Sequence, residues 1–354
     1  MELSVRPLEG ITVVELATFV AAPSSARVMA DWGANVIKVE SPKGDPMRNM
    51  GALVNMPTQP DENVAFDQQN SNKHSIVINL KDPDGMAVMH RLLEGADVFV
   101  TNNREDALVR MGLSYAQLAD RYPRLVYGQV SGYGEEGPHK DRPGYDFTAY
   151  YARGGISGTL YEKGTSPVMT VAGFGDQQVG LALTAGVCAA LLKVQRTGKG
   201  DKVSVNLYQT ALYCMEHLIA SSQYGNPYPR SRLDTSNPFQ AAYPTKDGRW
   251  IQGGVNAYDK DYQHICRLVG REGLAEDERF NTFAKVNARP FMMELDKAFR
   301  QKTADEWVKI FEDADLPFEK EMLWEEILED PQAWGDHDLA RVEDYPEDEK
   351  LGTS

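Results

Sequence analysis

The sequence is short of cysteine and of basic residues, and each shortage excludes a class of function. Its three cysteines, Cys188, Cys214 and Cys266, lie far apart and show no CxxC or metal-ligand spacing. We therefore expect no disulfide framework, and a reducing compartment fits the composition. The 37 basic and 52 acidic residues give a formal charge of −15. General binding of nucleic acid or of an anionic membrane is therefore not expected.

Signals for export and for membrane insertion are also missing. The amino terminus, MELSVRPLEG, lacks the apolar core of a signal peptide. No apolar run reaches about 18 residues, so we expect no membrane-spanning segment. The chain has 354 residues, of which 42% are hydrophobic and 25% charged. This composition is that of a soluble globular protein with room for two domains, and we expect it to be cytoplasmic.

Common site motifs are absent as well. The first strand-to-helix turn, Leu16–Pro23, has no glycine, so the GxGxxG dinucleotide signature is missing. Thr197–Gly200 (TGKG) does not complete a phosphate loop and is better explained as a turn. The sequence has no HExxH, GxSxG or metal-spaced set of histidines and cysteines, so we expect no metal.

Strand and helix signals alternate along the first 222 residues. Ile11–Leu16 is a predicted strand, Pro23 opens a helix that Gly33 ends, and Asn35–Glu40 is the next strand. Further strands are predicted at Ser75–Leu80, Val98–Thr101, Leu125–Val130 and Val203–Leu207, with helices from Pro83 to Leu93, from Asp176 to Gln195 and from Leu207 to Ser222. This order predicts an α/β fold with a doubly wound parallel sheet over residues 1–222.

The second part of the chain has a different pattern. Residues 223–231 are rich in turn formers and are a predicted linker. Residues 232–330 are a predicted smaller α+β domain, with a hairpin at Ala241–Gln252 followed by helices. Residues 331–354 form an acidic tail without a clear core pattern.

Basic and amide side chains follow two of the predicted strands. Asn79 and Lys81 lie at the end of one predicted strand, and Asn102, Asn103 and Arg104 lie at the end of another. Open α/β sheets bind ligands at the carboxyl ends of their strands, where these groups could hold the phosphates or amides of a nucleotide-like ligand. Ordinary polar loop ends look the same in a sequence, so both interpretations stay open.

Asp176 stands where a glycine-rich approach meets an apolar helix. Aspartate is a favoured N-cap, and the N–H groups of Gln178 and Val179 are its expected partners. The same position suits a nucleophile, because Gly173 and Gly175 let a ligand approach the backbone. N–H groups at a helix start can stabilise an oxyanion, and a carboxylate beside them could attack an electrophilic carbonyl. These residues alone leave the cap and the nucleophile as alternatives.

An ordered set of short segments resembles the class III coenzyme A transferases, the group of formyl-CoA transferase and carnitine CoA-transferase. The segments are Pro7–Leu16, Asp31–Glu40, Asn72–Ile76, Ala107–Gly112, Ser131–Gly134, Arg142–Asp146 and Arg196–Asp201. They follow one another in the family's order from residue 7 to about residue 335. Ala152–Thr165 and Glu329–Trp334 are similar to one subgroup in particular, the 2-hydroxyacyl-CoA transferases. That subgroup acts on phenyllactate with cinnamoyl-CoA or on 2-hydroxyisocaproate with its enoyl-CoA.

The resemblance implies roles for individual residues. The nucleophilic aspartate of the family falls on Asp176. Its coenzyme A contacts fall on Val20, Ala21, Ile78, Asn79, Leu80, Lys81, Asn102, Asn103, Arg104, Ala107, Arg110, Arg142 and Tyr145. The implied fold is a Rossmann-like large domain with a smaller domain, and the implied assembly is a homodimer of two interlocked rings.

The implied reaction moves CoA from an acyl-CoA or enoyl-CoA to a 2-hydroxy acid without metal or ATP. Asp176 attacks the thioester and forms an acyl-aspartyl anhydride, the CoA thiolate returns to give an aspartyl-CoA thioester, and the acceptor acid then takes the CoA. An exposed aspartate with a pKa of about 3.9 is ionised at neutral pH and needs no base. The helix-start N–H groups would serve the tetrahedral intermediates. The product would suit a 2-hydroxyacyl-CoA dehydratase.

Some positions depart from the family pattern. Ser41 stands where relatives have an arginine, which puts one CoA contact in doubt. Ser231–Gln240 replaces the glycine loop over the oxalate-type site, which argues against small dicarboxylates and for a bulkier acyl group. Relatives also continue beyond the position of Ser354, so we expect a family segment to be missing.

Two alternative functions share this fold. The α-methylacyl-CoA racemases also have an acidic residue at the position of Asp176, but their second base is a histidine where this chain has Tyr145. A tyrosine with a pKa near 10 is a poor base at neutral pH. The other alternative is a CoA-binding paralogue without turnover. The sequence leaves open whether the acyl group is aromatic or branched aliphatic.

Overall fold

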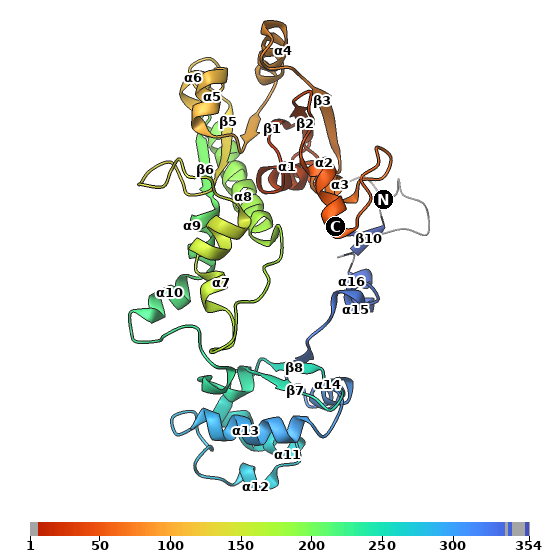
Figure 1. Ribbon diagram of the computed structural model, residues 1–354, viewed down its shortest axis with the longest axis vertical. Helices are drawn as coiled ribbons and strands as arrows, with labels where there is room; N and C mark the ends of the chain where they lie inside the picture. The colour runs from red at the N-terminus through yellow and green to blue at the C-terminus, as the bar shows by residue number, and fades with distance from the viewer. Residues whose placement is uncertain (1–5, 337–338, 342–350, 354) are drawn as a thin grey trace. The chain divides into compact units, whose positions relative to one another are not determined.

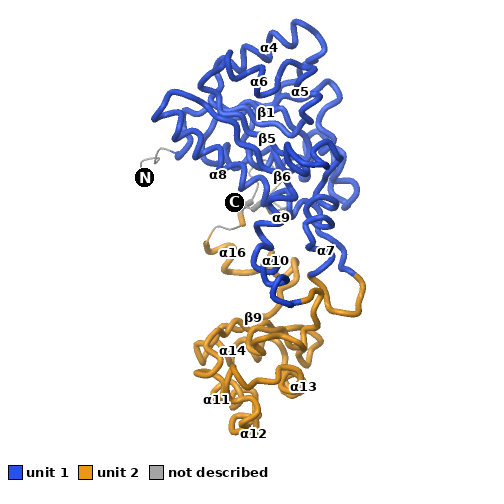
Figure 2. The backbone as a smooth tube through the Cα atoms, turned by 90° about the vertical axis from the view of Figure 1, so that its left-hand side faces the viewer, with its two compact units in different colours: residues 1–159, 167–226 blue, residues 160–166, 227–354 orange. Residues whose placement is uncertain are grey.

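A computed structural model describes residues 6–336, 339–341 and 351–353. The chain divides into two compact units, residues 1–159 with 167–226 and residues 160–166 with 227–354 (Figure 2). The division at Asn226 and Pro227 falls inside the predicted linker, 223–231. The second unit also takes the short segment Leu160–Ser166, which the sequence prediction had placed in the first domain.

Unit 1 is built around a six-stranded parallel sheet (Figure 1). Its strands are β1 (Thr12–Leu16), β2 (Asn35–Glu40), β3 (Lys73–Val77), β4 (Val98–Thr101), β5 (Val126–Ser131) and β6 (Lys202–Asn206). Their order, β3-β2-β1-β4-β5-β6, confirms the predicted doubly wound α/β fold. The order reverses between β1 and β4, and such a switch point is where open sheets bind ligands.

Helices cover both faces of this sheet. α1 (Ala21–Asp31) and α8 (Phe174–Thr197) pack on one face, and α4 (Pro83–Glu94), α5 (Glu105–Met111) and α6 (Tyr115–Leu118) pack on the other. Neighbouring strand residues accordingly enter different cores. Val13 joins the core with α1 and α8, whereas Val14 joins Met89 and Leu93 of α4. This alternation is the period of two expected of a strand buried on both faces.

α8 is the longest helix described, and its length and composition alone do not distinguish a core helix from a membrane span. It is long and apolar enough to cross a membrane, although no such segment was expected from the sequence. Val179, Leu183 and Val187 of α8 are fully buried in the core of unit 1. A side chain at Gly180 would collide with Ser24 of α1, so glycine allows the two helices to pack closely. α8 is therefore a core helix of a globular domain.

Several elements differ from the sequence predictions. β3 begins at Lys73, earlier than predicted, because that side chain reaches a buried carboxylate. The single helix expected after β6 is two helices, α9 (Leu207–Cys214) and α10 (Glu216–Ser222), since Met215 leaves the helical conformation. The remaining elements of unit 1 are α2 (Met47–Met50), a 3-10 turn (Gly51–Val54), α3 (Val64–Asn70), the π-helix η2 (Asp146–Arg153) and α7 (Ile156–Thr159).

Unit 2 has its own antiparallel sheet and an aromatic core. β7 (Ala242–Pro244) pairs with β8 (Trp250–Gly253), which confirms the predicted hairpin, and β8 pairs with β9 (Phe318–Lys320). The helices are α11 (Tyr258–Leu268), α12 (Glu272–Ala275), α13 (Ala288–Phe299), α14 (Ala304–Asp313), α15 (Trp324–Ile327) and α16 (Pro331–Gly335), and β10 (Leu339–Arg341) pairs with β11 (Leu351–Thr353). The rings of Tyr243 and Phe299 stack at 4.4 Å between centroids inside this core.

Candidate active site

A cavity of about 740 Å³ opens at the carboxyl ends of β1, β4 and β5. Its size is typical of small-molecule sites. All of its lining residues belong to unit 1: Thr18–Ala21, Asn102–Asp106, Gln129–Gly132, Gly134, Glu135, Lys140–Arg142, Gly144, Tyr145, Asp176, Lys202 and Leu207. The cavity thus lies at the topological switch point of the sheet, where the fold places ligands.

The structure brings together eight of the predicted site residues around this cavity. They are Val20, Ala21, Asn102, Asn103, Arg104, Arg142, Tyr145 and Asp176. The other six, Ile78, Asn79, Leu80, Lys81, Ala107 and Arg110, are not part of the lining formed by the described residues. Ile78 is buried in the core under α4, and Arg110 lies on the surface in a 2.7 Å ion pair with Asp106. Their predicted contacts with CoA stay predictions.

The turn between β1 and α1 forms one wall of the cavity and is held by side chains from other elements. The Thr18 N–H donates to Asn102 Oδ1 at 3.1 Å, and Asn102 Nδ2 donates back to the Thr18 carbonyl at 2.7 Å. Phe19 has a left-handed backbone (φ 64°), which costs energy for a residue with a Cβ. Its N–H donates to Asp45 Oδ1 at 3.1 Å. These bonds hold a conformation that the turn, having no glycine, would not adopt readily by itself.

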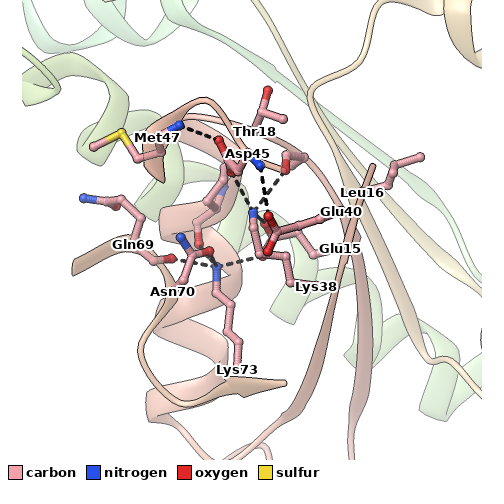
Figure 3. A network of polar contacts seen from close by, with 12 residues as sticks. Glu15, Leu16, Thr18, Lys38, Glu40, Asp45, Met47, Gln69, Asn70 and Lys73 are labelled. Atoms are coloured by element: carbon pink, nitrogen blue, oxygen red, sulfur yellow. Dashed lines mark hydrogen bonds and ion pairs between the residues drawn. The ribbon is translucent and has the colours of Figure 1, made fainter. Parts of the chain in front are cut away.

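A buried network of charges lies directly behind this turn (Figure 3). Lys38 Nζ lies 2.7 Å from Glu15 Oε1 and 2.9 Å from Asp45 Oδ2, and it also donates to the Ala17 carbonyl. Lys73 Nζ lies 2.7 Å from Glu15 Oε2. Burial opposes the charge on Lys38, but Glu15 and Asp45 outweigh it and raise the pKa of Lys38 above its usual value. The network therefore keeps its ion pairs and ties Asp45, the support of Phe19, to β1 and β2.

This network was missed in the sequence, although a signal was present. Glu15 stands between Val14 and Leu16 in β1, and Lys38 stands between Ile37 and Val39 in β2. A charged residue at such a position is rarely buried unless it is paired. The two strands are neighbours in the sheet, with Glu15 opposite Lys38 in the register. The pairing could therefore have been inferred once the strand order was known.

The start of α8 is capped by Asp146. α8 begins at Phe174, its N-cap is Gly173 (φ 80°), and Asp176 lies in the first turn. Asp146 Oδ2 accepts the Gly173 N–H at 2.8 Å, and Asp146 Oδ1 accepts the Gly175 N–H at 3.1 Å. One buried carboxylate thus satisfies two N–H groups at the helix start.

This arrangement corrects two expectations about Asp176. It does not cap its helix through Gln178 and Val179, because it lies inside the helix and another aspartate does the capping. Two N–H groups at the start of α8, those of Gly173 and Gly175, are not available to an oxyanion, because they already donate to Asp146. The start of α1 offers an alternative, since Val20 and Ala21 line the cavity and no side chain among the described residues caps α1.

The expected ionisation of Asp176 is also corrected. Asp176 is not an exposed carboxylate with an ordinary pKa. Burial, and then the charge of Asp146, raise the pKa of Asp176 from 3.8 to about 7. At neutral pH about half of the molecules therefore have an ionised Asp176.

The rest of the cavity combines basic and apolar groups. Arg104, Lys140 and Arg142 contribute positive charge to the lining. The rings of Phe19 and Tyr145 meet edge to face at 6.3 Å between centroids. Such a lining suits a ligand with both anionic and apolar parts. In the part of the chain that the structure describes, no group of three or more His, Cys, Asp or Glu side chains could hold a metal ion.

The segment Ser231–Gln240 is held by polar contacts inside unit 2. Glu162 accepts the Ser231 hydroxyl at 2.6 Å and the Arg232 N–H at 2.7 Å. The Arg232 guanidinium makes a two-bond contact with Asp296, at 2.9 and 2.8 Å. Ser41 lies exposed just after β2 and is not among the cavity residues described above.

Comparisons with known proteins agree with this fold and identify the family. The family model of CoA-transferase family III matches residues 8–350. The sequence is 47% identical over 329 residues to (R)-2-hydroxy-4-methylpentanoate CoA-transferase of Clostridioides difficile, covering 92% of this chain and 82% of that protein. It is 45% identical over 352 residues to cinnamoyl-CoA:phenyllactate CoA-transferase of Clostridium sporogenes, covering 98% and 85%.

Two solved structures are similar over nearly the whole chain. Rv3272 from Mycobacterium tuberculosis has a TM-score of 0.83 and 28% identity, covering 99% of this chain and 92% of that one. A CAIB/BAIF family protein from Brucella suis has a TM-score of 0.81 and 26% identity, covering 98% and 94%. Fold and cavity define a doubly wound α/β protein with a ligand site at the switch point of its sheet. The chain belongs to CoA-transferase family III, as the resemblance implied, and it is a CoA-transferase.

Proposed function

We propose that this enzyme transfers CoA from an acyl-CoA or enoyl-CoA to a 2-hydroxy acid, with Asp176 as the covalent carrier. One observation carries the proposal: Asp176 faces the cavity while Asp146 does the capping that Asp176 could otherwise have done. The Asp176 carboxyl is therefore left for chemistry. The names of the two relatives, which act on 2-hydroxy-4-methylpentanoate and on phenyllactate, support the choice of acceptor.

The proposed steps exchange one activated carbonyl for another. An oxygen of the Asp176 carboxylate bonds to the thioester carbon, the C–S bond breaks, and CoA leaves as a thiolate with the bonding electrons. The thiolate then attacks the Asp176 carbonyl of this anhydride, which releases the donor acid and leaves an aspartyl-CoA thioester. The carboxylate of the 2-hydroxy acid repeats both steps in reverse and departs as its CoA ester. No step requires ATP or a metal.

The other cavity residues serve binding and charge stabilisation in this proposal. The N–H groups of Val20 and Ala21 at the start of α1 stabilise the oxyanion of each tetrahedral intermediate. Arg104, Lys140 and Arg142 hold the phosphates of CoA. The substrate has a bulky aromatic or branched acyl group, consistent with Ser231–Gln240 in place of a glycine loop.

The biological setting belongs to the same proposal. The enzyme acts in the cytoplasm, and its product is consumed by a 2-hydroxyacyl-CoA dehydratase. We infer an interlocked homodimer, which would cover apolar side chains that are exposed on α8 and α9 and just after α10. They include Leu181, Tyr213 and Tyr224.

A panel of acyl-CoA donors and 2-hydroxy acids, assayed by mass spectrometry with Asp176→Ala as comparison, tests the proposal. We expect the variant to lose more than about a thousandfold in transfer rate while it still binds CoA esters. Undiminished transfer by Asp176→Ala would contradict the nucleophile. Exchange of the α-proton with solvent deuterium without an acceptor acid would indicate a racemase, and CoA-ester binding without either reaction would indicate a paralogue without turnover.

A further inference from the structure

We propose that Asp146 is a positioning residue for the transfer reaction, because its buried carboxylate replaces Asp176 as the cap of α8 and repels negative charge on Asp176. Acylation of Asp176 removes that charge, so the repulsion favours the covalent intermediates over the free carboxylate. The inference rests on the proposed role of Asp176 as the nucleophile. Asp146 thereby gains a function, whereas in the sequence it was only the last residue of the family segment Arg142–Asp146.

The contacts of Asp146 leave its charge without a cation beside it. Asp146 begins the π-helix η2, and only 5% of its surface is exposed. Its oxygens accept the N–H groups of Gly173 and Gly175, and no basic side chain among the described residues forms an ion pair with it. The positive end of the α8 dipole therefore compensates this carboxylate only partly. Burial raises the pKa of Asp146 itself, which its backbone N–H donors partly offset, and the ionised carboxylate raises the pKa of Asp176.

Close packing fixes Asp146 against the first turn of α8, which contains Asp176. A side chain at Gly175 would collide with Asp146 Oδ1 and with the ring of Tyr150, so only glycine lets Asp146 reach the backbone here. The Tyr150 hydroxyl donates to Gln178 Oε1 at 2.6 Å, which fixes η2 to the first turns of α8. Asp146 and Asp176 therefore lie on two elements that are locked together.

The other groups around Asp176 do not offset this repulsion. α1 presents its first turn, Ala21–Ser25, which has no ionisable side chain. From α3, Gln69 bonds to Gln177, and from α9, Cys214 donates to Gln178. Other charged residues of the cavity lining are Arg104, Glu105, Asp106, Glu135, Lys140, Asp141, Arg142 and Lys202. Beyond burial, Asp146 is the group that raises the pKa of Asp176.

The consequence for the reaction follows from where the charge goes. When Asp176 bonds to the thioester carbon, the C–S bond breaks and the negative charge leaves with the thiolate. Asp176 is neutral in both the anhydride and the aspartyl-CoA thioester. Repulsion from Asp146 thus raises the energy of the free enzyme without raising that of either intermediate, and the binding of substrate is unaffected.

The near-isosteric variant Asp146→Asn tests the inference, since it removes the charge and keeps a carbonyl acceptor for one N–H. We expect the acid limb of kcat/KM to move from about pH 7 toward the ordinary aspartate value of 3.8. We also expect the equilibrium fraction of enzyme trapped as aspartyl-CoA to fall several-fold. Asp201→Asn is the matched control. It removes an exposed charge that pairs with Lys193 near the other end of α8, and it should change neither quantity.

Two further measurements keep the inference falsifiable if Asp146→Asn folds poorly. Asp146→Glu keeps the charge and should keep the acid limb near pH 7. The infrared carboxyl band of Asp176, taken as wild type minus Asp176→Ala, should titrate near pH 7. The role of Asp146 would be overturned if folded Asp146→Asn kept both the acid limb of kcat/KM and the fraction of enzyme trapped as aspartyl-CoA unchanged. It would also be overturned if the infrared band of Asp176 titrated near pH 4. Either result leaves the nucleophile standing, because only activity in Asp176→Ala removes it.

Discussion

Asp176 combines two properties that the sequence could not reveal together: it faces a cavity, and its pKa is raised to about 7 by burial and by Asp146. Only the ionised form can attack a thioester. We therefore predict that kcat/KM rises about tenfold per pH unit below pH 7 and levels off above it. Rates measured between pH 5 and pH 9, on enzyme that is shown to stay folded at each pH, test this prediction. A flat profile above pH 5 would contradict the raised pKa.

The same shift makes a prediction about stability. The pKa of Asp176 is higher in the folded chain, about 7, than its usual value of 3.8. Protonated Asp176 therefore favours folding, and that contribution is complete below pH 3.8 and lost as the pH rises through 7. Asp176→Asn should raise the free energy of unfolding at pH 8 by about 2–4 kcal/mol and leave it nearly unchanged at pH 4. Denaturant unfolding at both pH values checks this, and equal effects at the two would contradict it.

At the residue scale, the sequence predicted which residues line the site better than it predicted the contacts that those residues make. The ordered motifs pointed to Asp176, and eight of the predicted residues line one cavity. The capping partner could not be predicted, because Asp146 is 27 residues from the Gly173 N–H that it accepts. Local rules for N-caps consider only the residues at the helix start. They therefore assign the cap to Asp176 instead of to a residue brought there by the tertiary fold.

At the scale of elements, the turn between β1 and α1 depends on the buried network behind it. Asp45 supports the strained Phe19 and pairs with Lys38. Asp45→Ala leaves a buried ammonium group with one carboxylate fewer, and the N–H groups of Phe19 and Met47 lose their acceptor. We predict a loss of about 3–5 kcal/mol in the free energy of unfolding and a higher KM for acyl-CoA.

Two variants serve as controls for this prediction. Asp45→Asn keeps an acceptor for Phe19 and should lose less stability than Asp45→Ala. Asp61→Ala removes an exposed aspartate of the same unit and should change little. If Asp45→Ala were as stable as Asp61→Ala, the turn would not depend on this network. Calorimetry and initial-rate measurements on the same preparations give both quantities.

The elements that the sequence predicted well have strong local signals. β1, β2 and β4 are apolar runs, and α4 begins at the expected Pro83 with Asp82 as its cap. The π-helix Asp146–Arg153 was not predicted, because its spacing departs from the 3.6-residue period on which helix prediction depends. The break at Met215 lies within an apolar stretch, where periodicity gives no warning.

At the scale of the whole molecule, the exposed apolar side chains of unit 1 lead to a prediction about assembly. Leu181, Tyr213 and Tyr224 are largely exposed in the single chain. If an interlocked dimer covers them, sedimentation equilibrium should give twice the chain mass at micromolar concentration. The unfolding midpoint should also rise with protein concentration, because subunits and stability are linked. A fully active monomer would contradict the proposed assembly.

The division into units was only partly visible in the sequence. The break at Asn226 and Pro227 lies in a stretch rich in turn residues. The segment Leu160–Ser166 joins unit 2 through contacts such as Glu162 with Ser231 and Arg232. Seven residues have no composition that distinguishes them from a loop of the surrounding domain. Their place is set by contacts with residues about 70 positions away.

The measurement that tests the central claim most directly is peptide mass spectrometry of enzyme quenched during turnover. Enzyme incubated with acyl-CoA is quenched in acid, or treated with hydroxylamine, and digested. The account predicts a CoA adduct, or a hydroxamate after hydroxylamine, on the peptide that contains Asp176, and no adduct in Asp176→Ala. CoA transfer without any modification of Asp176, or an adduct on a different residue, would contradict it.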